Sequence, residues 1–137
     1  MRPTFDAVGV VVADMAAAVA FYRTLGLDFE AGAEGAGHAE AVGAGGFRLM
    51  LDTEEVVASF DASWTPPPPG RGRIGLAFAC NGPDEVDAAH RRLVDAGHRS
   101  HLEPFDAFWG QRYGSVLDPD GNVVDLFAAL EARTASE

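Results

Sequence analysis

The strongest constraint on the fold is that the chain repeats one order of elements twice. The first copy opens on the short valine-rich run FDAVGVVV, which predicts a strand, and continues with Met15, Val19 and Tyr22 at helical spacing. Asp14 has the chemistry of an N-cap for this helix, and Gly26 can supply the left-handed residue that ends it. The runs LDFEA, HAEAV and FRLMLD then predict three shorter strands.

The second half follows the same plan. RIGLAFAC predicts a strand, and Pro83 suits the first turn of a helix whose apolar side carries Val86, Ala89 and Leu93. Gly97 ends that helix. HRSHLE, QRYGSVL and NVVDLFA predict three further strands, of which the last two form a hairpin around the turn DPDG. Each half therefore reads as strand, helix and three strands.

These halves define the expected domain organisation of an α+β chain. We expect a first module at residues 1–64, a proline-rich linker at 65–71, a second module at 72–130 and a flexible tail at 131–137. The linker holds the run TPPPPG, and polyproline makes a stiff, extended spacer.

Charge and composition exclude several classes of partner. The formal net charge of −11 argues against nucleic acid, whose phosphates demand a basic patch. An acidic surface attracts cationic small molecules, or it serves only to keep the protein soluble. Cys80 is the single cysteine, so there is no disulfide framework and no four-sulfur zinc site. No segment resembles a signal peptide or a membrane span, which predicts a cytoplasmic protein with no membrane partner.

Three motifs carry a resemblance to a known family. The first strand ending in VADM, the helix with FYRTLG and the hairpin DPDGNVVDLF resemble the vicinal-oxygen-chelate superfamily of glyoxalases, bleomycin-resistance proteins and dioxygenases. The resemblance covers about residues 4 to 130. It implies two βαβββ modules whose mixed sheet curls into a half-open cup, in which enzymes of the superfamily hold a divalent metal.

The resemblance also marks the positions where metal ligands would be expected. In this chain those positions are occupied by Ala7, Leu49, Gly75 and Asp125. Methyl, isobutyl and hydrogen side chains cannot coordinate a cation, and a lone carboxylate does not hold a dedicated metal. We therefore expect no metal, no cofactor and no catalytic residue, with small or apolar residues widening the cavity. This pattern resembles the metal-free bleomycin-resistance branch.

One other constellation could imitate a metal site. His38 begins the predicted strand HAEAV and could face the cup together with Glu40. Joined by Asp125, this pair would supply two carboxylates and one histidine. The alternative is that His38 and Glu40 are polar contacts for a ligand or are simply solvated.

Aromatic residues gather in two loops, PFDAFWGQRY before the last hairpin and VVASFDASWTPPPPG beside the linker. Those assigned to a ligand groove are Phe60, Trp64, Phe108 and Trp109. Flat aromatic walls bind planar heterocycles by stacking, although such rings also serve as core or dimer-packing residues. Phe47 alternates with Leu49 on a strand expected to face the cup. Gln111 and Arg112 can hydrogen-bond ligand carbonyls, and Arg112 can equally pair with a carboxylate.

The bleomycin-resistance proteins that this chain resembles bind their drug in grooves at a dimer interface. The resemblance thus implies a homodimer that sequesters a planar, partly aromatic antibiotic without chemistry. Abundant alanine and glycine, with arginine and no lysine, suggest a GC-rich genome such as that of an actinomycete, for which self-resistance is a reasonable role. The residues expected to line the ligand site are Ala7, His38, Glu40, Phe47, Leu49, Phe60, Trp64, Gly75, Phe108, Trp109, Gln111, Arg112 and Asp125.

Two other functions remain open. One is an isomerase, lyase or dioxygenase-like enzyme with an altered site, in which Asp125 or Glu40 acts as acid or base, because carboxylates in an apolar cup can transfer protons. The other is an interaction module that binds no small molecule.

Overall fold

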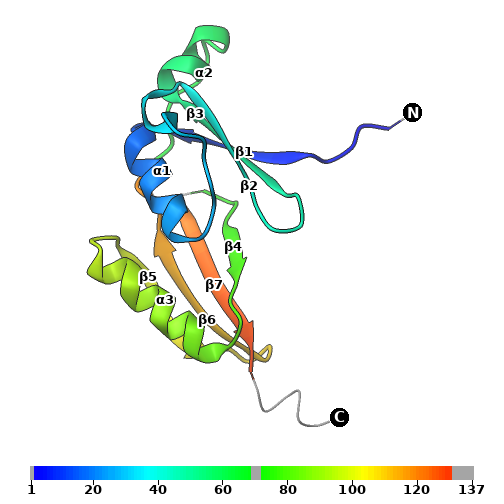
Figure 1. The fold of residues 1–137 in the computed structure, drawn as a ribbon, viewed down its shortest axis with the longest axis vertical. Helices are drawn as coiled ribbons and strands as arrows, with labels where there is room; N and C mark the ends of the chain where they lie inside the picture. Colours follow the sequence, from blue (N-terminus) through cyan, green and yellow to red (C-terminus); the bar gives the residue numbers. More distant parts are fainter. Residues whose placement is uncertain (1, 69–71, 131–137) are drawn as a thin grey trace. The chain divides into compact units, whose positions relative to one another are not determined.

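The computed structural model describes residues 2–68 and 72–130 (Figure 1). Contacts divide the chain into two compact units, Met1–Pro66 and Pro67–Glu137. Part of the predicted linker, residues 69–71, and all of the predicted tail, residues 131–137, lie outside the described residues. None of the described helices is long and apolar enough to cross a membrane.

The first unit is a three-stranded mixed sheet covered on one face by a helix (Figure 1). Its central strand β3 (Arg48–Thr53) runs parallel to β1 (Ala7–Val12) and antiparallel to β2 (His38–Val42). The helix α1 (Met15–Thr24) buries Val19, Phe21 and Tyr22 completely. These side chains form a core with the strand residues that face α1, including the fully buried Leu51.

Both predicted ends of α1 are confirmed. The side chain of Asp14 accepts a hydrogen bond from the backbone N–H of Ala17 at 3.1 Å, as an N-cap does. Gly26, just past the helix, has a φ of 90°, a left-handed conformation that glycine adopts without a steric cost.

We expect Asp14→Ala to lower the free energy of unfolding by about 1 kcal/mol, because the substitution leaves a backbone donor of the first turn without its partner. Asp14→Asn keeps an acceptor at the same position and serves as the control, with a loss well below that of the alanine variant. Urea denaturation followed by circular dichroism measures both. Equal losses in the two variants would contradict the capping role.

Two expectations for the first unit are wrong. LDFEA forms no strand, because Gly26 and Gly32, both left-handed, break the chain into turns that lead into a short 3₁₀ helix, η1 (Ala33–Gly35). An unexpected helix, α2 (Glu54–Phe60), follows β3 directly. Its N-cap is Thr53, whose side chain accepts from the N–H of Val56 at 3.2 Å. The first unit is thus strand, helix, two strands and a helix, rather than βαβββ.

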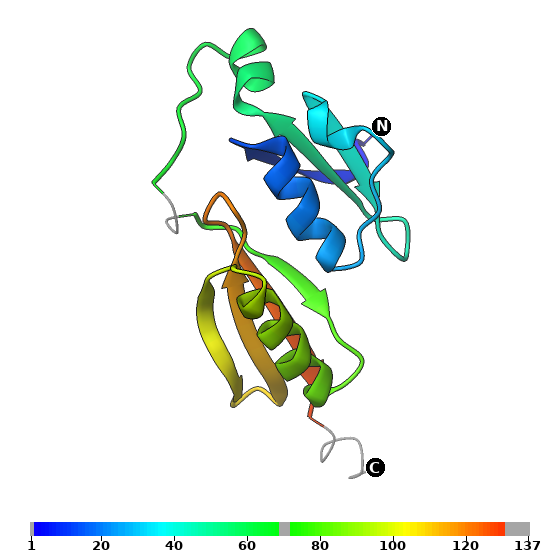
Figure 2. The same cartoon turned by 60° about the vertical axis from the view of Figure 1, so that its left-hand side comes forward.

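The second unit has the predicted order of strand, helix and three strands. Its mixed sheet has the order β4-β7-β6-β5, with β4 (Leu76–Ala79) parallel to β7 (Val123–Ala129) and the other neighbours antiparallel. The remaining strands are β5 (Ser100–Asp106) and β6 (Gln111–Leu117). The helix α3 (Pro83–Asp95) lies across one face of this sheet (Figure 2) and contacts β5, β6 and β7.

The turn between β6 and β7 fixes the register of the hairpin. The nearly buried carboxylate of Asp118 accepts hydrogen bonds from the backbone N–H groups of Asp120 and Asn122, at 2.9 and 2.8 Å. An Asp side chain that binds backbone N–H groups further along the chain stabilises a tight turn. The resulting register places Ser115 opposite Asp125 and Tyr113 opposite Phe127. The chain therefore has a mixed α+β fold with two sheets.

Candidate ligand-binding site

Strand alternation separates two faces of the second sheet. On one face, Arg112 reaches α3 and pairs with Asp87, while alternate residues of β7 are buried beneath the helix. The opposite face carries the intervening residues of the two strands. We call it the open face, since it lies away from α3, and define it by Gln111, Tyr113, Ser115, Asp125 and Phe127; Ser115 is fully buried and the other four are half-buried.

At one end of the open face, four aromatic rings form a cluster that we call the aromatic corner. Its members are Phe105, Phe108, Trp109 and Tyr113. The centroid of Trp109 lies 5.0 Å from that of Phe108, 5.3 Å from that of Tyr113 and 6.3 Å from that of Phe105. The four pairs of rings in contact stand edge to face, the geometry that the ring quadrupoles favour. Phe108 is 97% exposed and Trp109 is 46% exposed, so the corner presents rings to solvent.

The indole of Trp109 is held in place by local hydrogen bonds. Its Nε1–H donates to Oε1 of Gln111 at 2.8 Å. The loop below it closes through a bond from the N–H of Ala107 to the carbonyl of Gln111 at 2.8 Å, with Gly110 in a left-handed conformation. The structure thus brings Phe108, Trp109 and Gln111 together, three of the residues predicted to line a ligand site.

Asp125 lies near the aromatic corner and is bonded to a hydroxyl group. Ser115 Oγ donates to Oδ1 of Asp125 at 2.9 Å, and the hydroxyl of Tyr113 lies near the same carboxylate. Burial, together with this carboxylate, raises the pKa of Tyr113 to about 12. The Tyr113 phenol therefore remains protonated over the whole neutral range.

Arg112 is engaged on the other face of the sheet. Its guanidinium donates to both carboxylate oxygens of Asp87 on α3, at 2.9 and 3.3 Å, and to Asp106 at 3.1 Å. Of the two roles that the sequence suggested for Arg112, the structure shows the pairing with carboxylates. A contact between Arg112 and a ligand remains a prediction.

In the first unit, His38 and Glu40 share the sheet face away from α1 with residues of β3. His38 Nδ1 lies 2.6 Å from Oδ1 of Asp52, and Nε2 lies 2.8 Å from Oε2 of Glu40. Glu40 also pairs with Arg48, which pairs in turn with Asp6. We call this chain of contacts the His38 ladder. Hydrogen bonds to Glu40, and then to Asp52, raise the pKa of the imidazole because both nitrogens face carboxylates that favour the charged form.

The His38 ladder predicts a pH dependence of stability. Because folding raises the pKa of His38, the folded state binds this proton more tightly than the unfolded chain, whose histidine titrates near pH 6.5. The stabilisation is therefore complete below about pH 6.5 and is lost as the pH rises through the raised value. We expect the unfolding free energy of the wild type to fall across this range more steeply than that of His38→Gln.

Denaturant titrations at a series of pH values measure this difference. His101→Gln, which removes an exposed histidine outside the ladder, is the control and should follow the wild type. A His38→Gln variant with the same pH dependence as the wild type would contradict the role of the ladder.

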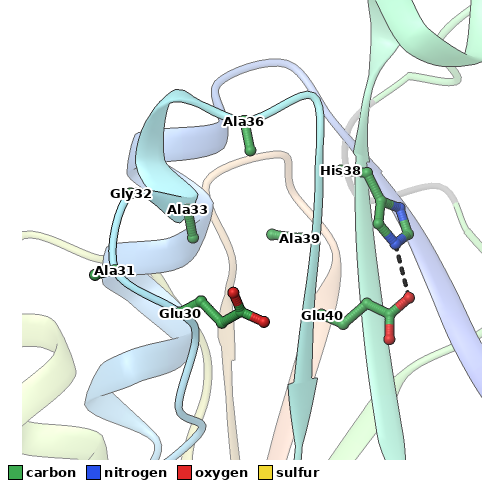
Figure 3. Close-up of a pocket in the computed structure, with 8 residues that line it drawn as sticks. All are labelled: Glu30, Ala31, Gly32, Ala33, Ala36, His38, Ala39 and Glu40. Carbon is green, nitrogen blue, oxygen red and sulfur yellow. Dashed lines mark hydrogen bonds and ion pairs between the residues drawn. The ribbon is translucent and has the colours of Figure 1, made fainter.

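A pocket of about 360 Å³ lies between the loop that contains η1 and strand β2 (Figure 3). The Glu30 carboxylate points into it, whereas Glu40 and His38 point toward each other at its edge. The other residues that line the pocket are alanines and a glycine, whose small size leaves this volume unfilled. They are Ala31, Gly32, Ala33, Ala36 and Ala39.

The expectation that Leu49 faces the cup is wrong. Leu49 is 3% exposed and belongs to the core beneath α1, because Arg48, Met50 and Asp52 occupy the opposite face of β3. Phe47 precedes β3, is 48% exposed, and contacts Phe5 with ring centroids 6.4 Å apart.

The predicted groove combined rings from both units. Phe60, at the end of α2, is 74% exposed, and Trp64 is half-buried a few residues later, both in the first unit. Phe108 and Trp109 belong to the second unit. The joint groove of these rings stays a prediction, while the aromatic corner is complete within one unit.

Comparison with protein families identifies the fold family. A family model described as the glyoxalase/bleomycin resistance protein/dioxygenase superfamily matches residues 4–126. The chain belongs to this superfamily. A comparison with curated protein sequences found no match.

Solved structures of the same fold cover nearly the whole chain. A glyoxalase/bleomycin resistance protein/dioxygenase from Nocardioides is 28% identical, with a TM-score of 0.72 and coverage of 96% of this chain and 86% of that chain. A hypothetical protein from S. aureus is 17% identical, with a TM-score of 0.77 and coverage of 94% and 95%. A glyoxalase-related enzyme from Fulvimarina pelagi is 21% identical, with a TM-score of 0.76 and coverage of 93% and 88%.

Within this superfamily fold, the positions implied for metal ligands offer one donor side chain. Ala7 and Gly75 have none, and Leu49 is buried and apolar. A Cβ added at Gly75 would lie 3.7 Å from Oδ2 of Asp125, so these two positions are spatial neighbours. A single carboxylate that already accepts a hydrogen bond from a hydroxyl does not fit a dedicated divalent metal.

The alternative metal constellation of His38, Glu40 and Asp125 is divided between the units. His38 and Glu40 lie together in the first unit, and Asp125 belongs to the second. Both nitrogens of His38 face carboxylates in the ladder. Across residues 2–68 and 72–130, no three histidine, cysteine, aspartate or glutamate side chains are grouped so that they could hold a metal ion.

Sequence reasoning missed Tyr113 and Ser115, which connect the aromatic corner to Asp125. A signal for them was present, because Gln111, Tyr113 and Ser115 alternate along QRYGSVL and must share one face of a strand. Counting back from the DPDG turn gives the pairing of Ser115 with Asp125, which the structure has. Phe105 also joins the site, as the partner of Tyr113 on β5.

Proposed function

We propose that this member of the superfamily is a metal-free binding protein that confers antibiotic resistance by sequestering a planar, partly aromatic drug and releasing it unchanged. The aromatic corner carries the proposal. Its rings are fixed edge to face, yet Phe108 and Trp109 remain largely open to solvent. Stacking of a flat ligand would cover this apolar surface, and each stacked pair contributes about 0.5–1.5 kcal/mol beyond the area that it buries.

The donor groups near the corner also favour binding over chemistry. Tyr113 is a weak acid whose proton stays in place at neutral pH, and Oδ1 of Asp125 accepts a hydrogen bond from the Ser115 hydroxyl. The positions where relatives would hold a metal supply no donor besides Asp125. Sequestration requires affinity and no catalytic group, so this set of residues is sufficient for it.

A homodimer in the cytoplasm is part of the proposal. Exposed aromatic rings occur in both units, at Phe5 and Phe60 in the first and at Phe108 in the second. Apolar surface of this kind is commonly covered by a second copy or by a ligand. Sedimentation of the purified chain is expected to give about twice the monomer mass of 14.4 kDa.

A thermal-shift screen against planar aromatic antibiotics tests the function. A drug that binds only the folded state raises its stability by about 2.7 kcal/mol when present at 100 times its dissociation constant. We expect at least one such drug to raise the melting temperature and to quench tryptophan fluorescence. Mass spectrometry should then recover the drug with its mass unchanged. A processed product, or a panel without any binder, would overturn the proposal.

A further inference from the structure

The open face holds a carboxylate without a cationic partner. Asp125 is half-buried, and its carboxylate accepts a hydrogen bond from the neutral hydroxyl of Ser115 and lies near the hydroxyl of Tyr113. In the described part of the chain it forms no ion pair, and Arg112, the cation that precedes Tyr113, is held on the other face by Asp87 and Asp106. A carboxylate removed from bulk water gains from a nearby positive charge.

There is room for such a charge beside Asp125. Ser115 bonds to Oδ1, while Oδ2 lies next to Gly75. A side chain at position 75 would begin 3.7 Å from Oδ2, but glycine leaves that space empty and is itself exposed. The exposed side of the carboxylate therefore opens toward solvent at a place where a ligand atom could lie.

The aromatic corner supplies a second attraction for a cation. The faces of aromatic rings are negative, and a cation within about 6 Å of a ring centroid is attracted to them, most strongly for tryptophan. Because contacting rings of the corner meet edge to face, neighbouring rings present their faces in nearly perpendicular directions. Tyr113 connects the two features, because its ring belongs to the corner and it shares one face of β6 with Ser115, which bonds to Asp125.

The charge of the whole molecule acts in the same direction. The net charge of −11 concentrates cations near the surface and repels anions. Exposed aromatic rings near a carboxylate are suited to a flat ring system that carries a positively charged nitrogen. The ring system stacks on Trp109 and Phe108, and the cation lies between the ring faces and Asp125.

We propose that the aromatic corner and Asp125 form a site for an organic cation, so that the ligand is a planar aromatic compound with a protonated or quaternary nitrogen. This proposal rests on the binding function proposed above and defines the chemical class of its ligand. Asp125 acts as the counterion at the position where enzymes of the superfamily would hold a metal.

Three acridine probes of similar shape test the proposal on the full chain. 9-Aminoacridine is protonated at neutral pH, N-methylacridinium carries a permanent charge, and acridine is neutral. We expect both cations to bind at least tenfold more tightly than acridine, as measured by quenching of tryptophan fluorescence. Asp125→Asn keeps the size of the side chain and should abolish this preference. Asp95→Asn, which removes an equal charge from the exposed end of α3, should retain it.

A measurement on the wild type alone protects the test against a variant that fails to fold. Tetramethylammonium chloride should displace aminoacridine more strongly than sodium chloride of equal ionic strength. Equal binding of acridine and the two cations, or a preference that survives Asp125→Asn, would overturn the cation site but leave the sequestration of neutral planar drugs intact. Failure of all three probes to bind would also overturn the cation site. The thermal-shift screen against antibiotics would still test the proposed sequestration function independently.

Discussion

Leu51→Ala is expected to lower the free energy of unfolding by about 2–5 kcal/mol. Leu51 is fully buried at the centre of β3, the strand that pairs with both neighbours in the first sheet. Its side chain lies on the face covered by α1, among residues that are also fully buried, such as Val19 and Phe21. Truncation removes apolar contacts on this face and leaves a cavity that the rigid strand closes only in part.

Met50→Ala is the matched control. Met50 is the preceding residue of the same strand, and its side chain lies on the other, partly open face. We expect it to cost about 1 kcal/mol or less, near the range for residues outside the core. Urea denaturation followed by circular dichroism measures both variants. Similar losses, or a larger loss for Met50→Ala, would mean that the two faces of the sheet had been assigned the wrong way round.

The same pair of residues shows why one expectation about the site was wrong. In FRLMLD, the apolar residues Leu49 and Leu51 alternate with Arg48, Met50 and Asp52. The more polar set should face a water-filled cup and the leucines should face a helix, since a half-buried strand keeps its apolar side toward the core. The resemblance placed Leu49 in the cup because it was matched to a ligand position, and the alternation pattern contradicts that match.

The elements that the sequence predicted best carry two independent signals. α1 has apolar residues at helical spacing and a capping aspartate, and the last hairpin has alternating strands around a turn-forming DPDG. LDFEA had only a short alternation, which Gly26 and Gly32 override. Helix α2 was not predicted, although its sequence carries the signals of a helix start. Thr53 is a capping residue, and Glu54 and Glu55 are acidic residues in the first turn.

The candidate site was predicted in part for a similar reason. Phe108 and Trp109 stand out as adjacent aromatic residues in a glycine-containing loop, and Asp125 stands out at a family position. Tyr113 and Ser115 have no such local mark. Their contacts depend on the register of β6 against β7, which the buried Asp118 turn determines. Contacts between strands are set by such turns and become visible only when the pairing is known.

Trp109→Ala is expected to weaken binding of the planar antibiotic found in the screen by about 1–3 kcal/mol, or roughly 5- to 150-fold. Trp109 contacts each of the other three rings of the aromatic corner and still exposes nearly half of its surface. Its removal deletes the largest stacking surface and frees Phe108 and Phe105 to move. Because the ring lies at the surface and its loop is closed by backbone hydrogen bonds, the variant should remain folded.

Titration calorimetry of the wild type and three alanine variants measures the effect. Val94→Ala, which removes an exposed apolar side chain from α3, is the control and should bind as the wild type does. Trp64→Ala tests the groove predicted across both units, since a loss comparable to that of Trp109→Ala would bring Trp64 to the ligand. A ligand stacked on the aromatic corner must lose affinity when its largest ring is removed. If the folded Trp109→Ala variant binds the drug as tightly as the wild type does, the aromatic corner is not the binding site.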